Sequence, residues 1–266
     1  MSEISIGDIL KVSIVTYKER WKTLLLISLI STIISTSTGI FSIIITSIGI
    51  SLLQVLLLLV NLVIMVISVY FTSRLFVTLI IASNNSLSNE DVIIFHSYEE
   101  AKHTTWRYIG ITLLFGLMLF IPILLMIFGI FNGSLMDISL PIRGILVIVG
   151  LLPAVYLSTT FYFSIYAAVL YPNETSVFSY SKQLVKGNFF KVLIITLIPI
   201  VITVPIIASS FYQNMNEISV GLQLIYSLVR SIHGMLIAPF TVLISIVAME
   251  RLEKTKENGH FHKNVT

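Results

Sequence analysis

The longest uncharged stretch of the sequence limits the fold most strongly. Residues 23–73 run for 51 positions without Asp, Glu, Lys, Arg or His. Because about 20 apolar residues are enough for a helix to cross a bilayer, this stretch predicts two membrane spans. The expected break lies near residues 46–51, where small and polar residues interrupt the dense Leu and Ile. We therefore predict an integral membrane protein.

Four further apolar runs bring the predicted number of spans to six: residues 108–136, 144–173, 192–216 and 220–249. Only 11% of the residues are charged, against about 25% in soluble domains. Lipid is therefore expected to cover much of the surface. We predict an all-α, polytopic membrane protein. An interfacial helix at residues 1–22 precedes a six-helix transmembrane domain at residues 23–249, and a polar tail follows at residues 250–266.

The positions of Lys and Arg predict the orientation. All but two of the 16 basic residues fall in the two terminal segments, between spans two and three, or between spans four and five. The two exceptions are Arg143 and Arg230. Because Lys and Arg are enriched in cytoplasmic loops, we expect a multi-pass protein of the cell membrane with both termini in the cytoplasm. Such an orientation also requires an even number of spans.

Three segments that precede spans one, three and five resemble one another. Each combines a predicted amphipathic helix, at residues 6–17, 91–103 or 176–186, with a following basic and aromatic cluster. The first helix begins with residues 5–8, which fit a capping box. The clusters recur after 84 or 85 residues. Two interpretations remain open: three repeated helix-hairpin units, or the even loop spacing of an ordinary six-span protein.

These clusters supply the candidate contact residues for lipid or a partner protein. Aromatic and basic side chains favour the membrane interface, where the rings meet the headgroups and the cations meet anionic lipid. Topology alone also explains basic residues at these positions. The candidates are Trp21, Trp106, Arg107, Lys182, Lys186, Phe190 and Lys191.

The last span contains Arg230 and His233, which lie three residues apart and hence on one helix face. If the span begins at Val220, Arg230 lies about 15 Å deep and marks an intramembrane polar site. If the span covers residues 231–249, Arg230 extends to the outer headgroups. We prefer the shorter span because it keeps an unpaired charge out of the hydrocarbon.

Span one carries small and hydroxyl-bearing residues at helical spacing, which predicts close packing against a neighbouring helix rather than a ligand path. These residues are Ser28, Ser31, Thr32, Ser35, Thr36 and Gly39.

No catalytic motif is found in the sequence. It has no Gly-rich phosphate loop, no zinc-protease motif and no cysteine, and no Asp or Glu falls in the spans. Cation-coupled transporters usually place a carboxylate there. We therefore expect no enzyme activity, no metal site and no cofactor, with membrane lipids or a membrane protein as partners and no nucleic acid.

Three segments resemble a bacterial membrane-protein family. They are residues 179–191 with their Lys-Gly-aromatic elbow, residues 8–10 together with residues 21–24, and residues 239–251 at the exit of the last span. The chain is similar to the membrane domain attached to some glycerophosphodiester phosphodiesterases and to standalone six-helix membrane proteins of unknown function. The family often has a Tyr-Asp-x-Arg-like exit, whereas this chain has Met249, Glu250 and Arg251. The resemblance implies a membrane module without the hydrolase.

The leading functional hypothesis is a non-enzymatic protein of the bacterial cytoplasmic membrane that binds lipid or a partner protein. A first alternative is a permease-like transporter subunit that needs a separate ATPase, with residues 91–103 as its coupling helix. A second alternative is an immunity protein against a membrane-active peptide or toxin.

Overall fold

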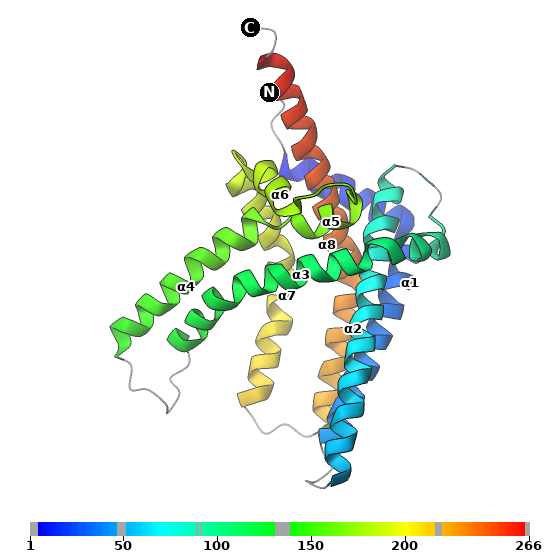
Figure 1. Cartoon of the computed structure of the whole chain (residues 1–266), viewed down its shortest axis with the longest axis vertical. Helices are drawn as coiled ribbons and strands as arrows, with labels where there is room; N and C mark the ends of the chain where they lie inside the picture. Colours follow the sequence, from blue (N-terminus) through cyan, green and yellow to red (C-terminus); the bar gives the residue numbers. More distant parts are fainter. Residues whose placement is uncertain are drawn as a thin grey trace.

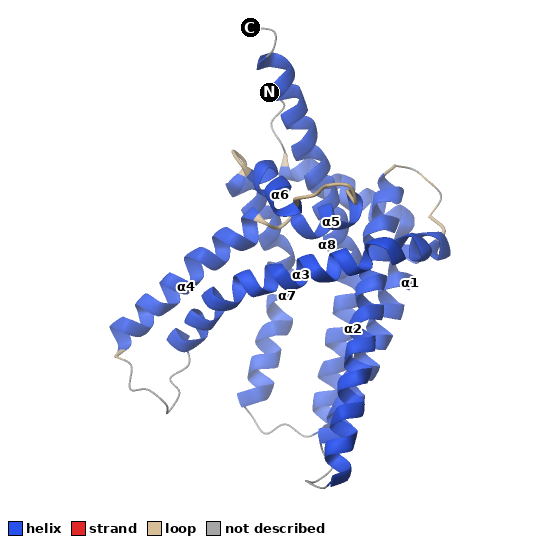
Figure 2. Cartoon of the chain, viewed as in Figure 1, coloured by secondary structure: helices blue, strands red, loops and turns tan. Residues whose placement is uncertain are grey.

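The computed structural model describes residues 5–46, 52–88, 90, 92–130, 139–215 and 220–263. Within these residues the chain is helical and has no strand (Figure 2), which confirms the predicted all-α class. The helices are α1 (Ile6–Thr46), α2 (Leu52–Leu87), α3 (Ile94–Ile130), α4 (Leu140–Thr160), α5 (Ser164–Leu170), α6 (Val177–Val185), α7 (Phe189–Met215) and α8 (Val220–Lys263). The predicted break at residues 46–51 lies almost entirely outside the described residues, as does Asp91.

Five of the described helical segments are long and apolar enough to cross a membrane. They are Ile6–Ser42, Val55–Leu87, Ile94–Ile130, Pro141–Leu170 and Tyr226–Lys256. A sixth is added if α6 and α7, which are bent by 109° at their junction, count as one span. The protein is therefore a multi-pass membrane protein with five or six apolar helices, and the number six stays a prediction.

Buried and lipid-accessible surfaces separate along the molecule. The start of α1 and the end of α8 lie at the same end of the molecule (Figure 1), and the core there joins the first turns of α1 to α5, α6 and the second halves of α2 and α8. Towards the other end, large apolar side chains are exposed on α2, α3, α4 and α7, including Leu62, Ile121, Leu152 and Val201. Exposed apolar surface of this extent requires lipid as its solvent.

Helix α2 extends beyond the uncharged run that predicts the second span. That run stops before Arg74, but the helix continues to Leu87. Its last turns bury Val77, Ile80 and Ala82 completely in the core. A charged residue therefore does not end this helix, because protein rather than water surrounds the turns that follow. In the same way, α8 continues past Met249 through the predicted polar tail to Lys263.

Helix α1 is continuous across the boundary predicted at residue 22. At its start the Asp8 amide donates to Ser5 Oγ at 3.4 Å, one half of the predicted capping box. Tyr17 Oη donates to the Leu236 carbonyl at 3.0 Å, and Thr36 Oγ1 lies 3.0 Å from Ser231 Oγ. These contacts are about 28 Å apart along α1 but about 8 Å apart along α8, so the two helices cannot run side by side throughout. Figure 1 shows the first turns of α1 lying across the end of the molecule from which the last turns of α8 project.

The hydroxyl groups of α1 connect it to both neighbouring helices. Besides the contact between Thr36 and Ser231, Thr38 Oγ1 lies 2.7 Å from Ser68 Oγ of α2. Farther along α1, Ser42 Oγ donates to Asn61 Oδ1 at 3.0 Å. Short polar side chains at helical spacing thus allow close approach and join the helices within an apolar environment. The packing role predicted for Thr36 is confirmed.

Helices α3 and α4 form a hairpin. The Arg143 side chain of α4 donates from Nε to the Gly129 carbonyl at 3.2 Å and from Nη2 to the Ile130 carbonyl at 3.0 Å. The last carbonyls of a helix have no intrahelical partner and carry partial negative charge, so a guanidinium group stabilises this end of α3. One of the two basic residues predicted to lie outside the cytoplasmic side thus caps a helix.

Candidate functional site

The candidate site with the clearest local geometry is the elbow between α6 and α7. The Val185 carbonyl accepts a hydrogen bond from the Asn188 amide at 2.8 Å, and the Asn188 carbonyl accepts from the Val192 amide at 3.0 Å. Between them Gly187 adopts a φ of +85°, in the left-handed region. Because glycine has no Cβ, it reaches this conformation without strain and allows the 109° bend.

Replacing Gly187 with alanine is expected to destabilise the protein by about 1–2 kcal/mol, since a Cβ disfavours the left-handed conformation. Crowding adds nothing to this cost, because a Cβ here would meet no atom within 4 Å. Thermal unfolding of the purified protein in detergent measures the change. Gly39→Ala is the matched control, because Gly39 lies within α1 in equally open space, where alanine favours the helix. Equal behaviour of the two variants would contradict the assigned role of Gly187.

The elbow carries exposed basic side chains and an exposed aromatic ring. Helix α6 buries Val177, Ser181, Leu184 and Val185 on one side. Lys182 and Lys186 are exposed, and Lys191 at the start of α7 is half-buried. The Phe190 ring is 76% exposed. No carboxylate pairs with these lysines within the described part of the chain, and the ammonium group of Lys256 on α8 is close enough to Lys186 for the two charges to repel.

Aromatic contacts hold the start of α7 against α4. The ring of Phe189 stacks on Tyr156 of α4, with 6.0 Å between the ring centroids, and contacts Phe190 edge to face at 5.7 Å. Phe189 therefore anchors α7 to α4, whereas Phe190 projects outward. The elbow therefore combines one exposed ring with exposed lysines.

The other two basic and aromatic clusters differ from the elbow. Trp106 is 69% exposed and packs against Tyr70 of α2 at 5.2 Å, and Trp21 is exposed on α1. Arg107 is engaged within the protein, because its Nη1 donates to the Tyr171 carbonyl at 2.8 Å and its Nη2 donates to the Glu174 carbonyl. It thus joins α3 to the segment before α6. Lys182, Lys186, Phe190 and Lys191 belong to the elbow and the helices on either side of it, whereas Trp21, Trp106 and Arg107 lie on α1 and α3.

The three entry segments also differ in backbone structure. The first and second clusters lie within the continuous helices α1 and α3, and only the third contains a break. Residues 94–103 of the predicted coupling helix form the first turns of α3. The threefold repeat stays a prediction.

Arg230 and His233 lie on α8, which continues through both without a break. Arg230 is exposed. His233 is half-buried, and its Nε2 atom is buried without a hydrogen-bond partner among the described residues. The structure therefore places the histidine nitrogen, rather than the arginine, inside the helix bundle. The choice between a span from Val220 and a shorter one stays a prediction.

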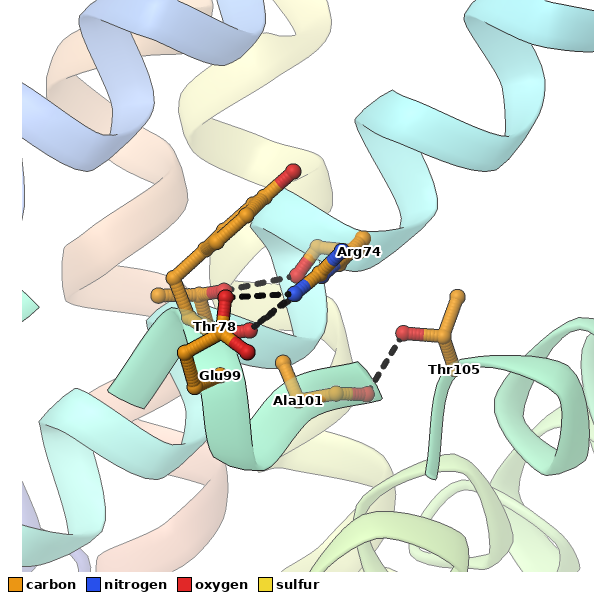
Figure 3. A network of polar contacts seen from close by, with 6 residues as sticks. Arg74, Thr78, Glu99, Ala101 and Thr105 are labelled. Atoms are coloured by element: carbon orange, nitrogen blue, oxygen red, sulfur yellow. Dashed lines mark hydrogen bonds and ion pairs between the residues drawn. The ribbon is translucent and has the colours of Figure 1, made fainter. Parts of the chain in front are cut away.

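The sequence did not single out the polar network around Arg74. Figure 3 shows its guanidinium group extending from α2 to the first turns of α3. Nη2 donates to the Tyr98 carbonyl at 2.9 Å, and Nε donates to the same oxygen at 3.2 Å. The guanidinium carbon lies 3.8 Å from the centroid of the Tyr98 ring, and the Glu99 carboxylate is 3.4 Å from Nη2. In the sequence, the one feature that could have drawn attention to this network is the position of Arg74 directly after the long uncharged run.

No family model, curated protein or solved structure matches this chain. The fold alone assigns the chain to a class, the multi-pass α-helical membrane proteins. The resemblance to the phosphodiesterase membrane domain stays a prediction.

Proposed function

We propose that the chain is a non-enzymatic protein of the bacterial cytoplasmic membrane that binds anionic phospholipid at the elbow between α6 and α7. The observation that carries this proposal is the set of lysines on α6 and α7 beside the exposed Phe190 ring, with no carboxylate partner in the described structure. The lysine ammonium groups are suited to bind the phosphate headgroup, and the exposed ring is suited to contact the acyl chain.

The packing of α6 supports this binding mode. Because Val177, Leu184 and Val185 face the core, the opposite face with Lys182 and Lys186 points away from the protein. Each basic residue near an anionic bilayer surface contributes about 1 kcal/mol of attraction. The positive-inside rule supports a cytoplasmic position for this end of the molecule, where the anionic headgroups of that leaflet lie.

Changing both Lys182 and Lys186 to glutamine is expected to weaken binding of phosphatidylglycerol roughly 30-fold, which corresponds to about 1 kcal/mol for each charge. Lipid that copurifies from bacterial membranes, quantified by mass spectrometry, and binding of fluorescent phosphatidylglycerol to the purified protein measure the effect. The double variant Lys18→Gln and Lys102→Gln is the matched control, because it removes two exposed lysines from α1 and α3. An equal loss in the control would indicate general charge attraction, and unchanged binding in the elbow variant would reject the site.

A further inference from the structure

A pocket with a volume of about 180 Å³ lies between the end of α2, the end of α5 and α8. Its wall combines the polar residues Asn84, Ser88, Tyr171 and Glu250 with apolar side chains that include Leu87 and Met249. The helices that border the pocket, α2, α5 and α8, also contribute side chains to the buried core, so the scaffold around the pocket is well packed. Neither the elbow lysines nor Arg230 contributes to this wall.

The pocket wall carries one carboxylate, that of Glu250. Glu250 uses Oε1 to pair with Lys254, and its Oε2 atom has no hydrogen-bond partner in the part of the chain that the structure describes. The last turn of α2 ends here, where the Ser88 amide donates to the Asn84 carbonyl at 3.2 Å. The carbonyl end of a long helix carries partial negative charge. A carboxylate and a helix C-terminus therefore face the same small volume.

Tyr171 forms a fixed wall of the pocket. Its hydroxyl donates to the Glu253 carboxylate, with distances of 2.8 and 3.0 Å to the two oxygens, and its carbonyl accepts from Arg107 at 2.8 Å. Its ring packs against Tyr180 at a centroid distance of 5.4 Å. Because these contacts hold the residue at both ends, the aromatic wall is preorganised. An aromatic ring next to acceptor groups is a favourable environment for an ammonium group.

We propose that this pocket binds a small molecule through a primary ammonium group, either a free amine or the ethanolamine headgroup of a phospholipid. The Glu250 carboxylate, the Asn84 side-chain oxygen and the Ser88 hydroxyl supply acceptors for its three N–H donors. Charge-assisted hydrogen bonds of this kind are roughly twice as strong as neutral ones. A trimethylated ammonium group cannot donate them, so the site should discriminate between the two. The proposal is independent of the anionic-lipid site at the elbow, which uses other residues and the opposite charge.

Thermal unfolding of the full chain in detergent tests this assignment. Ethanolamine hydrochloride should raise the unfolding temperature of the wild-type protein, whereas choline chloride and potassium chloride at equal ionic strength should raise it much less. For Glu250→Gln, the ethanolamine concentration that gives half of the maximal rise in unfolding temperature should be at least tenfold higher than for the wild type. Glu100→Gln, an exposed carboxylate on α3, is the matched control and should respond like the wild type. If Glu250→Gln fails to fold, Asn84→Leu takes its place.

An equal response to choline or potassium, or none to ethanolamine, would overturn the proposal. Two arms then identify the source of the ammonium group. Competition by nanodiscs of phosphatidylethanolamine, but not of phosphatidylcholine, indicates the lipid headgroup, and a persisting ethanolamine response without such competition indicates a free amine. The double variant at Lys182 and Lys186 should keep the ethanolamine response, so a failure at either site is distinguished from a failure at the other.

Discussion

Replacing Arg74 with leucine is expected to destabilise the protein by roughly 3 kcal/mol. The substitution removes two charge-assisted hydrogen bonds to the Tyr98 carbonyl and the stacking of the guanidinium group on the Tyr98 ring. Hydrogen bonds to charged groups contribute about 1.5–3 kcal/mol, and a desolvated cation–π contact contributes about 2 kcal/mol. Because these terms overlap at one side chain, the expected total is below their sum.

The ion pair in the same network should matter far less. The Arg74 side chain is 11% exposed, but the side chain of Glu99 is 53% exposed and 3.4 Å away. Exposed pairs of this kind contribute about 0–1 kcal/mol. Glu99→Gln should therefore change stability little. Arg74→Lys should be intermediate, since lysine keeps the charge but not the planar group that binds one carbonyl through two nitrogens and stacks on tyrosine.

Unfolding of the purified variants in detergent, followed by circular dichroism, measures these differences. Arg251→Leu is the matched control because Arg251 is exposed on α8, and its loss should cost at most about 0.5 kcal/mol. The network would lose its assigned role if Arg74→Leu behaved like Arg251→Leu. It would need a different explanation if Glu99→Gln were as damaging as Arg74→Leu.

Arg74 also shows where prediction of the fold from sequence succeeds and where it stops. The uncharged stretch of residues 23–73 correctly predicts apolar helices, because lipid and the interior of a helix bundle both select the same side chains. It does not predict where the helix ends, since the turns after Arg74 are apolar in order to pack against α8 and α5. Hydropathy cannot distinguish a residue that faces lipid from one that faces protein.

The candidate site was predictable to a similar extent. The spacing at residues 176–186 predicts the helix that the structure shows as α6, with Ser176 and Lys186 as its flanking residues. The sequence could not predict that Arg107 binds two carbonyls more than 60 residues away. Such contacts depend on how the helices assemble. For the same reason, the pocket beside Glu250 could not be located from the three separate segments that line it.

The second large effect on stability is expected in the hairpin of α3 and α4. Two glycines lie where these helices meet. A Cβ on Gly150 would lie 2.5 Å from the Pro122 carbonyl oxygen and 2.8 Å from the Met126 amide nitrogen of α3. On the facing helix, a Cβ on Gly129 would lie 2.8 Å from the Arg143 carbonyl oxygen. Backbone atoms cannot rotate away from such a contact, so the helices have to separate. Small residues at helix crossings in membranes have this role.

Gly150→Ala is therefore expected to destabilise the protein by about 3 kcal/mol, the upper end of the range for overpacked sites. Gly144→Ala in the same helix meets no atom within 4 Å and should be neutral or stabilising, since alanine favours a helix by up to about 1 kcal/mol over glycine. Spin labels on cysteines introduced at the exposed Leu117 and Leu152 would report the separation, because the chain has no native cysteine. A longer label distance in Gly150→Ala but not in Gly144→Ala is the expected result. Unchanged distance and stability would show that these glycines do not set the packing of the hairpin.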